Sequence, residues 1–203
     1  MNTITALEGD KRTSRPFLSD VNTIRERARQ HMEQGAVTPG YDADLETVLR
    51  LLNEALATEL VCVLRYKRHY MVAQGILAEA IKEEFLVHAK EEEGHADLIA
   101  ERIVQLGGDP NFDPAGLATR AHSQYGPSDQ LEEMLKEDLL AERVAVESYR
   151  EMIQYLENAD STTRRMLEGI LAKEEEHAEE LSSMLAGLKE VLNAGDRLVP
   201  QPG

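Results

Sequence analysis

The stretch AKEEEGHADL at residues 89–98 returns almost unchanged as AKEEEHAEEL at residues 172–181. Both copies consist mainly of alanine, glutamate, lysine and leucine, which are strong helix formers. Up to the histidine the copies differ by one inserted glycine, Gly94, and this insertion changes which glutamate faces the same way as the histidine. Each histidine must therefore be compared with its own neighbours before the two copies are compared with each other.

Helical spacing identifies the part that the two copies share. Side chains three or four positions apart lie on one face of a helix. Three positions before His95 stands Glu92, and three positions before His177 stands Glu174. The residues four positions before the two histidines are a glutamate in one copy and a lysine in the other. The repeated unit is therefore Glu-x-x-His on a single helix face.

The rest of the chain has the same helical character. No segment alternates between apolar and polar residues with a period of two, so no strand is predicted. Glycines and prolines end the helical patterns at several points, and Ser128 is a suitable N-cap for one of them. The predicted helices are a short one at 20–34 and four long ones at about 44–73, 77–106, 128–157 and 160–193.

The lengths of the connections predict how the long helices pack. The first and third connections are very short, so each joins two antiparallel helices. The middle connection, 109–127, contains three prolines and is long enough to cross the length of a bundle. We therefore expect an all-α, antiparallel four-helix bundle made of two helical hairpins with a long crossover, plus a short N-terminal helix. The predicted parts are an N-terminal extension at 1–43, the bundle at 44–193 and a flexible tail at 194–203.

Four glutamates fall within apolar helix faces, where carboxylates are unusual. They are Glu59, Glu92, Glu142 and Glu174. Glu59 and Glu142 are each followed seven positions later by a tyrosine, Tyr66 and Tyr149. The alternative interpretation is a set of solvated surface charges. The shared register of all four glutamates with leucine, isoleucine and valine positions favours a place inside the bundle.

Charge balance then predicts a metal centre. Four unpaired buried carboxylates would cost much free energy, and two divalent cations would neutralise them. Two helices that give one Glu each, and two that give Glu-x-x-His, form the carboxylate-bridged di-iron arrangement. Oxygen-rich ligation with one imidazole per metal suits Fe or Mn better than structural Zn. We expect two Fe ions per subunit, with Mn or Zn as substitutes, and the predicted ligands are Glu59, Glu92, His95, Glu142, Glu174 and His177.

Composition limits the classes of function. The 203 residues carry a formal net charge of −16, which suits a cation-binding protein and argues against general affinity for nucleic acid. The single cysteine, Cys62, excludes an intrachain disulfide and a four-thiolate metal site. No apolar run approaches the ~18 residues of a membrane span, and residues 1–17 lack the apolar core of a signal peptide. We expect no membrane partner and a cytoplasmic location.

The segments LATELVCVLRY, EEEGHADLIAERI, DLLAERVAVESYR and LAKEEEHAEEL resemble the bacterioferritin branch of the ferritin superfamily. The resemblance covers residues 44–190 and implies a ferritin-like bundle with terminal ligands Glu59 and Glu142 and bridging ligands Glu92 and Glu174. It places Tyr66 beside the di-iron centre, so we count it among the catalytic residues. It also implies ferroxidase activity, in which Fe(II) is oxidised with O2 or H2O2, storage of ferric iron in an oligomeric shell, and protection from oxidative damage.

Several positions depart from the bacterioferritin pattern. The methionine that binds haem in that family is replaced by Glu93, so no haem is expected. Of its inner-surface iron site only the acid, Glu91, remains, since Val87 replaces the histidine. The tail after Asn193 does not resemble the fifth helix of 24-subunit shells. The long crossover and the N-terminal extension instead resemble Dps-like mini-ferritins with a bacterioferritin-type site, so we expect a homo-oligomeric dodecamer.

Two other functions stay open. A di-iron or di-manganese peroxidase or catalase could use the same ligands without storing iron. A DNA-protecting protein of the Dps type is the other alternative, because residues 11–29 are rich in Lys and Arg and could bind DNA. A helix that docks on a neighbouring subunit explains this segment equally well, and the total charge favours that interpretation.

The other chemically notable residues have simpler interpretations. His88, one turn before Glu92, is predicted as a core residue or as a partner of the ligands. Cys62 is predicted as a small buried apolar residue. His31, His69 and His122 have no partners at ligand spacing and are predicted to lie at the surface.

Overall fold

A computed structural model describes residues 19–198 of the chain. Over this range the structure contains helices and no strand, as predicted. The first part holds α1 (Val21–Ala28) and the 3-10 turn η1 (Met32–Gln34). The elements that follow are α2 (Leu45–Val72), α3 (Ala78–Gln105), the short α4 (Leu117–Arg120), α5 (Leu131–Leu156) and α6 (Ser161–Leu198).

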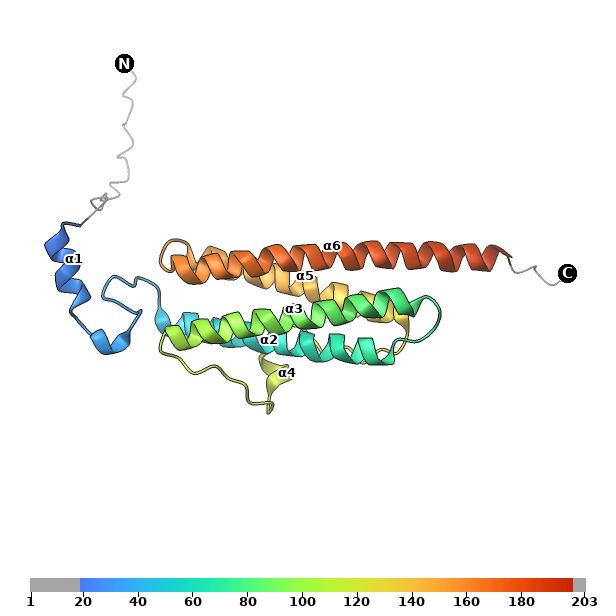
Figure 1. The fold of residues 1–203 in the computed structure, drawn as a ribbon, viewed down its shortest axis with the longest axis horizontal. Helices are drawn as coiled ribbons and strands as arrows, with labels where there is room; N and C mark the ends of the chain where they lie inside the picture. Colours follow the sequence, from blue (N-terminus) through green and yellow to red (C-terminus); the bar gives the residue numbers. More distant parts are fainter. Residues whose placement is uncertain (1–18, 199–203) are drawn as a thin grey trace, which may run out of the picture.

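The four long helices form two antiparallel hairpins that pack against each other (Figure 1). The first hairpin pairs α2 with α3, and the second pairs α5 with α6. Across the bundle α2 contacts α5 and α3 contacts α6. The chain from 106 to 130, which includes α4, runs along the outside of α2 and connects the hairpins. The predicted all-α four-helix bundle with a long crossover is confirmed.

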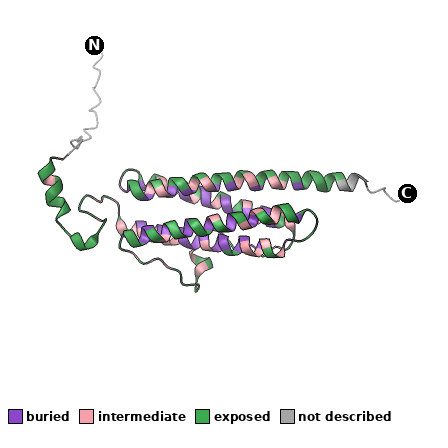
Figure 2. Cartoon of the chain, viewed as in Figure 1, coloured by how far each residue is buried: buried purple, intermediate pink, exposed green. Residues whose placement is uncertain are grey.

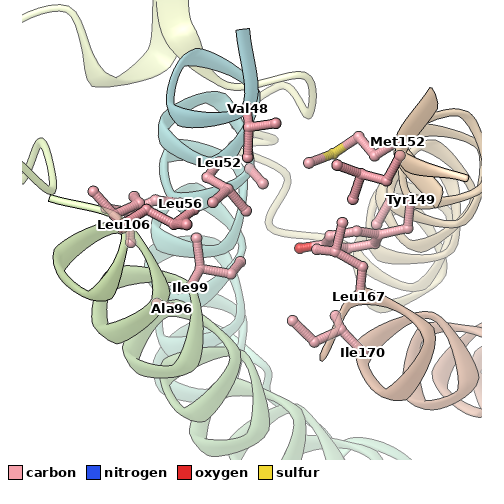
Figure 3. Close-up of a cluster of buried hydrophobic side chains, with 14 residues drawn as sticks. Val48, Leu52, Leu56, Ala96, Ile99, Leu106, Tyr149, Met152, Leu167 and Ile170 are labelled. Atoms are coloured by element: carbon pink, nitrogen blue, oxygen red, sulfur yellow. The ribbon is translucent and has the colours of Figure 1, made fainter. Parts of the chain in front are cut away.

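Two clusters of buried apolar side chains fill the bundle. One is built around Leu52, Leu56, Ile99 and Ile170, and Figure 3 shows these side chains converging from three of the helices. The members of the other cluster include Tyr66, Phe85, Leu135 and Leu181. On every long helix the predicted ligand positions fall between the residues of the first cluster and those of the second. The two apolar clusters therefore lie on either side of the ligand positions along the bundle. Figure 2 shows buried residues, in purple, along the four long helices.

Two helix ends differ from the prediction. The N-cap position of α5 is Gln130, not Ser128. The Ser128 hydroxyl instead donates to Glu137 Oε1 at 2.7 Å, so its polar group is satisfied by a side chain rather than by the helix end. At its other end, α6 runs to Leu198 instead of ending near Asn193.

The predicted helix at 20–34 is interrupted. The Asp20 side chain caps α1 by accepting from the Asn22 and Thr23 amides at 2.9 and 3.2 Å. The helix then ends at Ala28, and His31 adopts a left-handed backbone with φ of 52°. No residue of α1 is buried. Residues 1–18 and 199–203 lie outside the described range, so the three-part division and the role of the basic segment stay predictions.

Candidate metal centre

The six predicted ligands meet in the middle of the bundle. Each long helix supplies one glutamate, and α3 and α6 each add the histidine that follows three positions later. Five of the six residues are at most 1% exposed, and His95 is 8% exposed. Helical periodicity alone is enough to bring them together, because each lies on the apolar stripe of its helix.

The ligand atoms form two groups of four, each gathered within 4.8 Å. One group combines Glu59, Glu92, His95 and Glu174. In the other, Glu142 and His177 take the places of Glu59 and His95. Glu92 and Glu174 belong to both groups, as residues that bridge two cations must. The arrangement thus has the two-fold repeat that the duplicated sequence predicts.

Several buried oxygens of this cluster lack a hydrogen-bond donor. They are Glu59 Oε2, Glu142 Oε2 and both oxygens of Glu174. His95 Nδ1 lies 2.8 Å from Glu174 Oε1, an ion-pair contact without hydrogen-bond alignment. A buried oxygen without a partner is costly. Divalent cations would supply the missing partners, so the donor set fits the two ions that the sequence predicts.

Two tyrosines hold the outer glutamates in place. The Tyr66 hydroxyl donates to Glu142 Oε1, and the Tyr149 hydroxyl donates to Glu59 Oε1. In each glutamate the tyrosine fixes one oxygen and leaves the other free for a ligand. Burial, followed by the charge of the neighbouring carboxylates, raises the pKa of both phenols well above the ordinary value, so they remain donors.

The outer glutamates favour the protonated form in the metal-free protein. Burial is the main reason why the pKa of Glu59 lies well above its ordinary value, and the charges of Glu174 and Glu92 add to it. Glu142 is shifted in the same direction by burial and then by the same two carboxylates. At both residues a metal ion would therefore compete with a proton.

The bridging glutamates and the histidines instead favour their charged forms. Burial opposes the charge on Glu92, but hydrogen bonds from His177 and His95, at 3.1 and 3.3 Å, lower its pKa below the ordinary value. Contacts with the same histidines also lower the pKa of Glu174 against the effect of burial. Burial disfavours the imidazolium form, yet the carboxylates raise the pKa of His95 to about 12 and that of His177 to about 10.

These directions predict an exchange of protons for cations. We infer from these directions that Glu59, Glu142, His95 and His177 favour their protonated forms without metal, and a ligand set for two divalent ions must lose these protons. We expect about four protons to be released as two divalent ions bind. Because the raised pKa values favour the protonated groups at neutral pH, metal affinity should rise with pH and fall on acidification. Calorimetric titration with Co(II) in buffers of different ionisation enthalpy measures this release, and a value near zero would contradict the assigned protonation.

Neighbouring side chains orient His177. Its Nε2 lies 2.7 Å from Glu91 Oε2, while its Nδ1 faces the cluster. The ring of His88 stacks on it with a centroid distance of 4.1 Å. His88 is fully buried and contacts the Tyr66 hydroxyl through Nδ1 at 3.2 Å. The structure thus puts His88 in the core and against a predicted ligand, as the sequence suggested.

One predicted surface residue, His69, is fully buried, so that prediction was wrong. Its Nδ1 lies 2.8 Å from Asp138 Oδ2, and the other oxygen of Asp138 accepts from Arg65 Nε at 2.7 Å. Arg65 and Asp138 are both 0% exposed. The sequence offered one signal: Asp138 stands four positions before Glu142 and therefore shares its inward face.

The remaining predictions, for Cys62, His31 and His122, are confirmed. Cys62 is buried, as expected. His31 lies at the surface, also as expected. His122 is exposed, also as expected, and its Nδ1 approaches Ser148 Oγ at 3.0 Å.

The fold and the paired Glu-x-x-His units define a class of ferritin-like helical bundles. The sequence model of the ferritin-like domain matches residues 49–191, and the chain belongs to this family. Bacterioferritin of Mycobacterium leprae is 33% identical over 140 residues, 68% of this chain and 84% of that protein. The DNA protection during starvation protein of Pyrococcus furiosus is 33% identical over 147 residues, 71% of this chain and 80% of that protein.

A solved structure with the same fold is the dodecameric thioferritin of Bacteroides fragilis, a bacterioferritin-related protein. It is 29% identical to this chain, with a TM-score of 0.71 and coverage of 78% of this chain and 94% of that one. Among residues 19–198, the long helices are too polar to cross a membrane.

Proposed function

We propose that this chain is a ferroxidase that oxidises Fe(II) with O2 or H2O2 and stores the ferric product in a shell of identical subunits. The observation that carries the proposal is the set of buried carboxylate oxygens without donors at the centre of the bundle. Such oxygens are costly unless cations bind them. The relatives named bacterioferritin support iron as the cation.

Each ligand has a distinct part in this proposal. Glu92 and Glu174 would hold two Fe(II) ions as bridging ligands. Each Fe(II) would give one electron to the oxidant. Glu59 with His95, and Glu142 with His177, would complete the two sites. The apolar clusters on either side restrict water, and the two tyrosines keep the outer carboxylates in position.

The assembly and the location are parts of the same proposal. The dodecameric relative supports a shell of twelve subunits, and an acidic chain would suit an inner surface that attracts iron. A cytoplasmic location follows from the same interpretation. Haem is not included, because Glu93 stands at the predicted haem position and pairs with Lys67 at 3.4 Å on the bundle surface.

The other two functions predict different behaviour. The relative named for DNA protection supports a DNA-protecting role, to which the exposed arginines of α1 could contribute basic groups. A peroxidase or catalase would turn over peroxide without accumulating iron. If the Mn form released oxygen vigorously from peroxide, that function would replace storage.

Iron uptake followed by sizing tests the proposal. Apoprotein is given Fe(II) in large excess with air or with H2O2, and the product is separated by size and assayed for iron. We expect a large particle that retains many more irons than its centres can hold. A small oligomer that keeps only the ions of the centre would contradict storage and favour a di-metal redox enzyme.

A further inference from the structure

A second set of side chains that could hold a metal ion lies beside the candidate centre. Glu84 and His88 stand one turn apart on α3, and Glu180 lies opposite them on α6. Their ligand atoms fall within 4.8 Å of one another. His88 Nε2 lies 3.0 Å from Glu180 Oε2 and 3.7 Å from Glu84 Oε1. None of these three residues was predicted as a ligand, and Glu84 and Glu180 take no part in the centre described above.

The imidazole of this cluster is held firmly. The His88 side chain is 0% exposed. Its Nδ1 contacts the Tyr66 hydroxyl, and its ring stacks on His177. These contacts fix the ring so that Nε2 points at the two carboxylates. A metal site needs its ligands oriented in advance by such neighbours.

The two carboxylates make the cluster open to solvent. The side chains of Glu84 and Glu180 are 36% and 38% exposed, in contrast to the buried ligands of the centre. A cation could therefore arrive from water, bind three protein ligands and keep water in its remaining positions. One imidazole with two carboxylates suits Fe(II), Mn(II), Co(II) or Zn(II) better than Ca(II) or Mg(II).

We propose that Glu84, His88 and Glu180 form a third divalent-cation site, separate from the di-metal centre. In the cell this site binds Fe(II) next to the di-metal centre, before the ion is oxidised. The two sites are in direct contact, because His88 contacts both His177 and Tyr66. Tyr66 in turn donates to Glu142. The assignment of iron rests on the proposed function, whereas the binding of a divalent cation does not.

Cobalt binding to the full-length apoprotein tests the proposal without any oxidation. Bound Co(II) is counted by equilibrium dialysis, and its position is found by anomalous diffraction from crystals grown with Co(II). We expect about three ions per subunit, with one anomalous peak between Glu84, His88 and Glu180. If about two ions bind and no peak lies there, the third site does not exist.

A double variant separates metal binding from a merely structural contact. Glutamine can still accept from His88, so Glu84→Gln with Glu180→Gln keeps the hydrogen bonding but removes the anionic ligands. We expect this variant to bind about two Co(II) ions and to lose the third peak. The matched control changes the adjacent exposed residues, Glu83→Gln with Glu179→Gln, and should bind about three. Unchanged cobalt content in the first variant would overturn the proposal.

A further variant distinguishes this proposal from the proposed function. Glu92→Gln with Glu174→Gln removes both bridging ligands and should leave the third peak as the main one. If the third peak is absent while the two ions of the centre bind, only the third site fails. If wild-type protein shows the peak between Glu84, His88 and Glu180 but no peak at the di-metal centre, the proposed function fails instead.

Discussion

Replacing Glu92 with Gln and His95 with Ala should slow the fast oxidation of Fe(II) by about 100-fold or more. Glu92 belongs to both ligand groups, and His95 is the only imidazole of one group. Their loss removes ligands from both predicted iron positions at once. Stopped-flow absorbance after mixing the Fe(II)-loaded protein with oxygenated buffer measures the rate.

The variant should still fold, because protons can replace metal ions on the remaining carboxylates of the apoprotein. Circular dichroism should therefore show wild-type helix content. The matched control, Glu93→Gln with Asp97→Ala, changes exposed residues of the same helix and should oxidise Fe(II) at the wild-type rate. A Glu92→Gln, His95→Ala variant that is as fast as wild type would mean that oxidation takes place elsewhere.

The largest loss of stability is expected at Asp138. Asp138→Ala should lower the free energy of unfolding by about 3–5 kcal/mol, because it leaves the Arg65 charge buried without its counter-ion. The same change removes the hydrogen-bonding partner of His69 Nδ1. Urea unfolding of the metal-free protein, followed by circular dichroism, measures the loss.

Two companion variants make the cause clear. Glu151→Ala removes an exposed carboxylate from the same helix and should change stability by less than about 0.5 kcal/mol. Arg65→Met with Asp138→Leu replaces the ion pair by apolar side chains and should recover most of the loss. If Asp138→Ala lowers the free energy of unfolding as little as Glu151→Ala does, the Arg65–Asp138 ion pair does not stabilise the protein.

The fold and the candidate centre follow from local sequence patterns. The helical period determines which face each glutamate shares with leucines, and short connections determine which helices pair. Glu59, Glu92, Glu142 and Glu174 were therefore predictable as a group, because each is conspicuous among apolar neighbours on its own helix. No partner on another helix had to be known for that inference.

The buried ion pair was missed for the opposite reason. Arg65 and His69 lie on α2 of the first hairpin, whereas Asp138 lies on α5 of the second. Spacing along one helix does not reveal which residues meet across the bundle. The same limit applies to the third cation cluster, whose members lie on α3 and α6. Spacing along α6 does not single out Glu180, and only its place opposite His88 gives it a chemical meaning.

The helix ends were missed because local preference competes with other contacts. Ser128 is a good N-cap by type, but Glu137 accepts its hydroxyl, and α5 begins only after Gln130. At the C-terminal end, Gly195 did not stop α6, because glycine weakens a helix without preventing it.

The central claim is that one subunit oxidises two Fe(II) ions together at the buried carboxylate centre. The most direct measurement is the amplitude of the fast oxidation phase when apoprotein is loaded anaerobically with increasing Fe(II) and then mixed with O2 or H2O2. We predict that the amplitude rises linearly and saturates at about two Fe(II) per subunit, with further iron oxidised more slowly. A fast phase that saturates at about one iron, or that grows without saturation, would contradict the claim.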